Sequence, residues 1–199
     1  PLRWPLTRPA LFLLALAAEL SLLLAALALG RLLDQPVWGT LEWQASAVAL
    51  GTAASLPLLA FFAWTLHAAG GPLADIREFL ESHARPFFGS WSGLELAAIS
   101  LAAGVCEEVL FRGVLQAGLD RLFGPVLAVV LTGALFGVCH GVTRAYAVLA
   151  GLLGVYLGLL QVVSGNLLAP MVTHAIYDFV ALMWLLRWRR PTSGMTESP

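Results

Sequence analysis

Uncharged apolar stretches recur along this chain, and each is long enough to cross a lipid bilayer as a helix, which takes about 20 mostly apolar residues. Six such segments are present. Their expected bounds are Pro9–Leu29, Ala45–Leu66, Gly93–Leu119, Pro125–Val142, Ala145–Val163 and Leu167–Trp188. The sequence therefore predicts an all-α fold, a polytopic bundle of about six transmembrane helices.

The composition agrees with a membrane protein and excludes two common classes. Hydrophobic residues make up 59% of the 199 residues and charged residues 12%, whereas an ordinary soluble domain carries about 25% charged residues. The net charge is −1, and the 11 basic residues are all arginine, which leaves no basic surface for a nucleic acid. We expect one membrane-embedded domain over residues 1–199, with the functional motifs in 93–188 and a disordered tail at 189–199.

The segment between the second and third expected spans has a different pattern. In Pro72–Phe88, one arc of the helix is mainly apolar and the opposite arc is charged. This pattern is typical of a helix that lies in the membrane interface, and a short soluble connecting helix is the alternative. The mainly apolar arc comprises Leu73, Ile76, Phe79, Leu80, His83 and Phe87.

The arginines predict how the bundle is oriented. If the N-terminus is cytoplasmic, eight arginines lie in cytoplasmic segments and only Arg31 and Arg121 lie in segments on the opposite side. Because basic residues accumulate in cytoplasmic loops, we expect both termini in the cytoplasm. A chain rich in alanine, leucine and arginine and free of lysine also indicates a GC-rich bacterial genome, so the expected location is a bacterial inner membrane.

Ionisable residues inside the apolar segments are the candidates for function, because a charged side chain at the bilayer centre costs about 2.5–3.5 kcal/mol. The third segment contains Glu107, Glu108 and Arg112. Glu108 and Arg112 are four residues apart and share a helix face, so we expect them to form an ion pair. Glu107 points about 100° away from Glu108 around the helix, which leaves its carboxyl group available for another partner.

Two further segments contribute histidines. His140 lies near the end of the fourth segment, and His174 and Asp178 lie one helical turn apart in the sixth. A single histidine in a helix is more often a hydrogen-bonded core residue than a catalytic one. Here, acidic and imidazole side chains come from three separate segments that contain few other charges. We therefore expect them to converge on one site.

Such a set of side chains suits more than one chemistry. Glu107 and His140 could share a water molecule, remove its proton and direct its oxygen at a carbonyl carbon. His174 with Asp178 could then donate hydrogen bonds to the oxyanion. Alternatively, Glu107, His140 and His174 could bind zinc, with water as the fourth ligand. Spacing does not separate these two mechanisms, and buried acidic and imidazole groups also occur in proton-coupled transporters.

Glycines recur at four-residue spacing in two of the apolar segments. Gly133, Gly137 and Gly141 lie in the fourth segment, and Gly154 and Gly158 lie in the fifth. A helix face made of small residues lets two helix backbones approach closely within a membrane. We therefore expect these glycines to serve helix packing.

Three short motifs follow one another, each in its own segment: Glu107-Glu108-x-x-x-Arg112, Phe136-x-x-x-His140 and His174-x-x-x-Asp178. Together they resemble the signature of the CPBP intramembrane proteases, a family that includes the CAAX prenyl endopeptidases. The resemblance implies that Glu107 is the base that activates water and that His140 helps to hold this water. It implies that His174 and Asp178 stabilise the oxyanion. The residues that would support them are Glu108, Arg112 and Phe136.

One position departs from the pattern, because many relatives have asparagine where this chain has Asp178. An amide can donate a hydrogen bond to an oxyanion, whereas an ionised carboxylate cannot. The oxyanion role is therefore better supported for His174, and Asp178 could instead orient His174.

The expected function is that of an intramembrane endopeptidase that cleaves the tail of a membrane-tethered protein or peptide. Members of the family are described both as metalloproteases and as glutamate-dependent proteases. The resemblance to a water-activating Glu/His pair favours the glutamate-dependent form, without a metal cofactor. A zinc-dependent form of the same protease and a proton-coupled membrane transporter are the alternatives.

Overall fold

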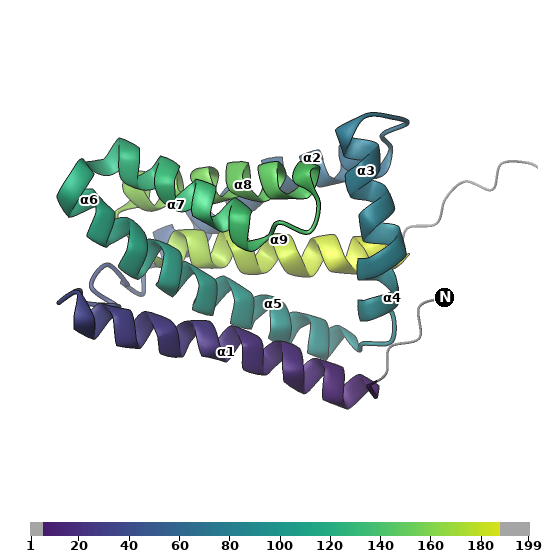
Figure 1. The fold of residues 1–199 in the computed structure, drawn as a ribbon, viewed down its shortest axis with the longest axis horizontal. Coiled ribbons are helices and arrows are strands. Elements are labelled where there is room, and N and C mark those ends of the chain that lie inside the picture. Colours follow the sequence, from purple (N-terminus) through teal and green to yellow (C-terminus); the bar gives the residue numbers. More distant parts are fainter. Residues whose placement is uncertain (1–5, 188–199) are drawn as a thin grey trace, which may run out of the picture.

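The computed structural model describes residues 6–187, and every regular element in that part of the chain is helical. Two π-helical segments, labelled η, interrupt the α-helices. Figure 1 shows the long helices side by side in one bundle, with α3 and α4 across one end. In chain order the elements are α1 (Arg8–Leu32), α2 (Ala45–Leu66), α3 (Pro72–Phe79), η1 (Leu80–Ala84), α4 (Arg85–Phe88), α5 (Gly93–Glu108), η2 (Val109–Gln116), α6 (Ala117–Phe123), α7 (Pro125–Cys139), α8 (Arg144–Ser164) and α9 (Leu168–Arg187).

The expected all-helical bundle is confirmed, and the second expected span coincides with α2. Four helices, α1, α2, α8 and α9, are by themselves long and apolar enough to cross a membrane. α7 is shorter, and α5 has two glutamates at its end. The last residue of the sixth expected span, Trp188, and the expected disordered tail at 189–199 lie outside the described residues.

The third expected span is helical but not uniform. A capping box formed by Ser92 and Glu95 begins α5, which satisfies backbone N–H groups that a helix start leaves unpaired. α5 then continues directly into η2 and α6, so the middle of this long helix is π-helical. π-helical turns are rare and occur frequently at functional sites. The apolar pattern of the sequence predicted the helix here but not its change of winding.

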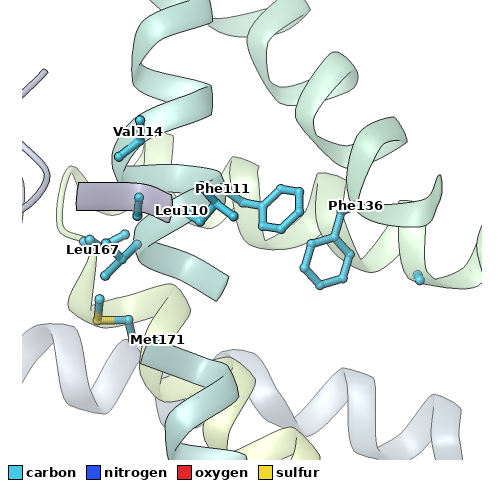
Figure 2. Close-up of a cluster of buried hydrophobic side chains, with 9 residues drawn as sticks. Leu110, Phe111, Val114, Phe136, Leu167 and Met171 are labelled. Atoms are coloured by element: carbon cyan, nitrogen blue, oxygen red, sulfur yellow. The ribbon is translucent and has the colours of Figure 1, made fainter. Parts of the chain in front are cut away.

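A large cluster of buried apolar side chains surrounds η2. In Figure 2, the ring of Phe111 from η2 points toward the ring of Phe136 from α7, and the two ring centroids are 4.9 Å apart. Residues of α1, α8 and α9 complete the cluster. This packing fixes the position of the segment that follows the two glutamates of α5. The buried members are Ala26, Val109, Leu110, Phe111, Val114, Phe136, Ala150, Leu167 and Met171.

The expected packing role of the glycines is confirmed for α7 and α8. A Cβ atom on Gly137 would lie 2.5 Å from the carbonyl oxygen of Ala147, and one on Gly154 would lie 3.0 Å from Gly133 Cα. Such distances leave no room for a side chain, so the two backbones are in direct contact. Gly141 lies beyond the end of α7, and its nearest neighbours belong to its own turn.

The expected amphipathic helix forms as α3, η1 and α4, and it runs across the end of the bundle where α1 begins (Figure 1). Arg85 Nη1 donates a hydrogen bond to the carbonyl oxygen of Leu186, which ties α4 to the end of α9. Ile76, on the apolar arc, is buried against the protein. The location of this helix in a membrane interface stays a prediction.

Candidate active site

Glu108, Arg112 and His174 form an ionic cluster in the protein interior, and each is less than 5% exposed. Arg112 Nη1 donates a hydrogen bond of 2.9 Å to Glu108 Oε1, as the four-residue spacing predicted. The same oxygen lies 2.8 Å from His174 Nδ1. The sequence predicted that His174 would converge with the glutamates, but not that Glu108 would be its partner. Glu108 thereby links the α5–η2 helix to α9.

Arg112 is held on several sides. Its Nη2 donates a hydrogen bond of 2.7 Å to the carbonyl oxygen of Gly154 in α8. Its guanidinium carbon lies 5.0 Å from the centroid of the Phe136 ring, within the range of a cation–π contact. A buried charge is costly unless it is paired and hydrogen-bonded. These contacts therefore make the cluster a rigid support that joins four helical segments.

His174 also faces Asp178, one turn further along α9. The distance from His174 Nε2 to Asp178 Oδ2 is 3.5 Å, which is longer than an ordinary hydrogen bond. The Asp178 side chain is 31% exposed, whereas that of Glu108 is fully buried. A neutral imidazole donates through only one nitrogen, so a His174 ring that donates to both carboxylates carries a positive charge. Such a ring can stabilise an anion that develops beside it.

Glu107 and His140 form a second, looser pair. His140 Nε2 lies 3.7 Å from Glu107 Oε2, too far for a direct hydrogen bond. His140 Nδ1 lies 2.9 Å from the carbonyl oxygen of Phe136. Because a carbonyl oxygen only accepts, Nδ1 carries the hydrogen and Nε2 is the nitrogen that faces Glu107. Glu107 Oε2 is shielded from solvent and has no hydrogen-bond partner within residues 6–187.

Phe136 separates and aligns the two pairs. Its ring stacks on His140 with a centroid distance of 4.3 Å and meets His174 at a steep angle with a centroid distance of 6.1 Å. The residue is almost fully buried. Phe136 therefore orients both imidazoles and covers Arg112, as its supporting role in the motif predicted.

A cavity of about 470 Å³ lies beside the site, and we refer to it as the apolar cavity. His140 and Asp178 form part of its wall, next to Tyr146 and Tyr177. The remaining wall is mainly aromatic and aliphatic and comes from α2, α9 and the helix across the end of the bundle. The apolar arc predicted for that helix contributes Ile76, Phe79, Leu80, His83 and Phe87. This arc therefore faces the cavity.

The sequence left open a zinc site formed by Glu107, His140 and His174. Among residues 6–187, no three His, Cys, Asp or Glu side chains are placed to hold one metal ion. His174 Nδ1 is bound to Glu108 at 2.8 Å, and its Nε2 lies 3.5 Å from Asp178 Oδ2.

Sequence reasoning missed one acidic residue beside the site. Glu19 is the only charged residue of α1 between Arg8 and Arg31. It is partly buried and interacts electrostatically with His174 and Asp178. The signal was present in the sequence, because an acidic residue inside an apolar span is costly unless it faces the protein interior.

The part of the chain that carries the site is similar to a known protein family. Residues 89–180 match the family model described as type II CAAX prenyl endopeptidase Rce1-like. This stretch is similar to the CAAX-type proteases. It contains all seven motif residues, from Glu107 to Asp178. No curated protein and no solved structure matches the chain. The CAAX-type stretch begins after α2, so Glu19 lies outside it.

Proposed function

We propose that this protein is an intramembrane endopeptidase that hydrolyses a peptide bond in the tail of a membrane-tethered protein or peptide. The family indicates a protease that acts on membrane-anchored protein substrates. The observation that carries the finer proposal is the placement of Glu107 and His140. They face each other beside the buried cluster of Glu108, Arg112 and His174, and His140 also lines the apolar cavity.

In the proposed mechanism, Glu107 is the general base and needs no metal. A water molecule between Glu107 Oε2 and His140 Nε2 can form hydrogen bonds of ordinary length to both atoms, which are 3.7 Å apart. Glu107 accepts a proton from this water as the water oxygen attacks the carbonyl carbon of the substrate. The C–N bond then breaks, and Glu107 returns the proton to the departing amine.

His174 is the proposed oxyanion donor. It is fixed through Nδ1 by Glu108, so that its Nε2 side faces Asp178 and the wall of the apolar cavity. Preorganised donors of this kind contribute much of the stabilisation of a charged transition state. Asp178 carries no donor when ionised, and we assign it the role of orienting His174.

The apolar cavity is the proposed site for the apolar part of the substrate. Pockets for small ligands usually have volumes of about 300–1,000 Å³ and mostly apolar walls, and this cavity has about 470 Å³. An apolar group seated here would place a peptide bond near His140 and Asp178. The printed family name specifies a prenyl endopeptidase, and for this chain we propose the broader class of membrane-anchored tails, in a bacterial inner membrane.

The deciding experiment is a cleavage assay in liposomes. The probe is a fluorescent peptide with a lipid-modified cysteine near its C-terminus, compared with the same peptide without lipid and with a peptide anchored by one apolar helix. We expect cleavage of a tethered probe by the wild type and a loss of about 10³-fold in Glu107→Gln, because general base catalysis contributes about 10²–10⁴-fold. The control is Glu78→Gln, an exposed acidic residue of α3. Wild-type rates in Glu107→Gln would contradict the proposal.

Two further measurements separate the alternatives. Exhaustive chelation is expected to leave the cleavage rate unchanged, and loss of activity that only zinc restores would favour a metalloprotease. A transporter would instead show solute or proton flux in proteoliposomes, with flux lost in Glu107→Gln while no probe is cleaved. We expect no such flux.

A further inference from the structure

Glu19 lies on the face of α1 that packs against the rest of the protein. Ala15 and Leu11, one and two turns earlier, pack in a cluster with Ile99 of α5 and Phe179 of α9. Leu22 and Leu23, one turn later, and Ala26, two turns later, pack in a cluster with Leu110 and Met171. Residues four apart share a helix face. Glu19 is therefore an acidic residue in the middle of an otherwise apolar inward stripe.

The position of this stripe places Glu19 at the level of the site. The two clusters contact α5 and η2 on either side of Glu107, and they contact α9 on either side of His174. Glu19 interacts electrostatically with both of these residues and with Cys106.

One oxygen of the Glu19 carboxyl group has no direct partner in the described part of the chain. Its Oε2 atom is shielded from solvent and accepts no hydrogen bond from the described part of the chain. An unpaired acidic group in a partly buried position lowers stability, and such residues are found mainly at functional sites.

Glu19 and His140 lie on different sides of Glu107. Figure 1 shows α1 along one side of the α5–η2 helix and α7, which carries His140 at its end, along the other. Like charges repel each other more strongly where the surroundings are poorly polarisable. A negative charge on the α1 side therefore disfavours any rotamer that turns the Glu107 carboxyl group away from His140.

We propose that Glu19 is a positioning residue of the active site, whose charge keeps the Glu107 carboxyl group turned toward His140. Its role in catalysis rests on the proposed function, whereas its placement beside Glu107 does not. The active site would then include a residue of α1, which lies outside the CAAX-type stretch.

A double-mutant cycle in thermal stability tests the placement without any substrate. The variants are Glu19→Gln, Glu107→Gln and the double variant, in detergent. Each single change removes one of two repelling charges, so we expect each to raise Tm by on the order of 2–4 °C. The double variant should raise Tm by clearly less than the sum of the two single increases, because both changes relieve the same repulsion. The control pair is Glu107→Gln with Glu42→Gln, an exposed acidic residue before α2, which should be additive. Additivity for Glu19 and Glu107 would overturn the proposal.

Kinetics with the tethered probe then test the positioning role. We expect Glu19→Gln to lower kcat about 10-fold with KM within 2-fold of the wild type, and Glu19→Asp, which restores the charge, to recover most of the rate. Ser21→Ala, an exposed position on α1, should leave both constants unchanged. If the Tm changes of Glu19→Gln and Glu107→Gln are not additive but Glu19→Gln has the wild-type kcat, the positioning role is wrong. If the wild type cleaves no probe, the proposed function fails, and the cycle alone decides whether Glu19 faces Glu107.

Discussion

Glu107 and Glu108 are neighbours in the sequence, yet they occupy different environments. Glu108 is fully buried, and its Oε1 is bound by Arg112 and by His174 at distances of 2.9 and 2.8 Å. Glu107 forms no ion pair with an arginine within residues 6–187, and its Oε2 lies 3.7 Å from His140 Nε2. Glu108 is held in a hydrogen-bonded network, whereas Glu107 Oε2 has no hydrogen-bond partner in the described part of the chain.

The difference follows from helix geometry. Adjacent residues point about 100° apart around a helix, so Glu108 faces α9 and the arginine one turn later, while Glu107 faces the end of α7. Two fixed donors hold Glu108 through its Oε1 and tie it into the fold, although its Oε2 has no partner within residues 6–187. Glu107 has no such donors in the described part of the chain, so its carboxylate is available to take a proton. We therefore assign Glu108 a structural role and propose a chemical role for Glu107.

The largest expected difference between the two glutamates is in stability. Glu108→Gln removes the charge that compensates Arg112 and binds His174, and breaking a buried ion pair costs about 3–5 kcal/mol. Glu107→Gln removes an unpaired charge and should leave the free energy of unfolding equal or higher. Thermal unfolding of both variants in the same detergent measures this. Equal destabilisation by the two changes would remove the contrast.

The next effect concerns the looser pair. His140→Ala removes the imidazole that holds the water opposite Glu107, and we expect kcat for a tethered probe to fall about 10²-fold. Because the His140 side chain is 28% exposed, the unfolding temperature should change little. Cleavage rates and Tm of the same preparation test both statements. A large drop in Tm would show that His140 supports the fold as Glu108 does.

A smaller effect is expected for Phe136, which contacts both pairs. Phe136→Leu keeps an apolar side chain but leaves part of the ring volume empty, which should cost about 1–1.5 kcal/mol. It also removes the ring that stacks on His140 and lies under Arg112. We expect kcat to decrease about 10-fold, as measured with the tethered probe. An unchanged kcat together with a lowered Tm would limit Phe136 to packing.

The smallest effect is expected for Asp178, which is partly exposed and 3.5 Å from His174. Asp178→Asn keeps the size of the side chain and supplies an amide N–H, so we expect a change in kcat of about 3-fold or less. Steady-state kinetics on the tethered probe measure this change. A loss comparable to that of His140→Ala would mean that the carboxylate charge itself acts in catalysis.

Much of the fold followed from local patterns. The limits of α2, the amphipathic helix across the end of the bundle and the Glu108–Arg112 pair were predicted, because each depends on residues within a few helical turns. The packing role of the glycines was also predicted, but not that α7 and α8 contact each other through them. The π-helical winding of η2 was not predicted. Apolar periodicity in a short window does not distinguish it from an α-helix.

The sequence predicted that the motif side chains lie close together, but only some of the contacts between them. The motif spacing named Glu107, His140 and His174, but it did not indicate that His174 binds Glu108, because that contact joins residues 66 positions apart. Glu19 was missed because it belongs to no motif, although a single acidic residue in an apolar helix marks an inward-facing position.

The sequence by itself determined that the chain forms apolar helices and that a few ionisable residues must be kept away from lipid, because burial of charge and helix periodicity act over short distances. The tertiary structure decided which acidic group meets which base. It did so through the packing of α1, α7, α8 and α9 around the α5–η2 helix, which alone brings side chains of distant segments within hydrogen-bonding range.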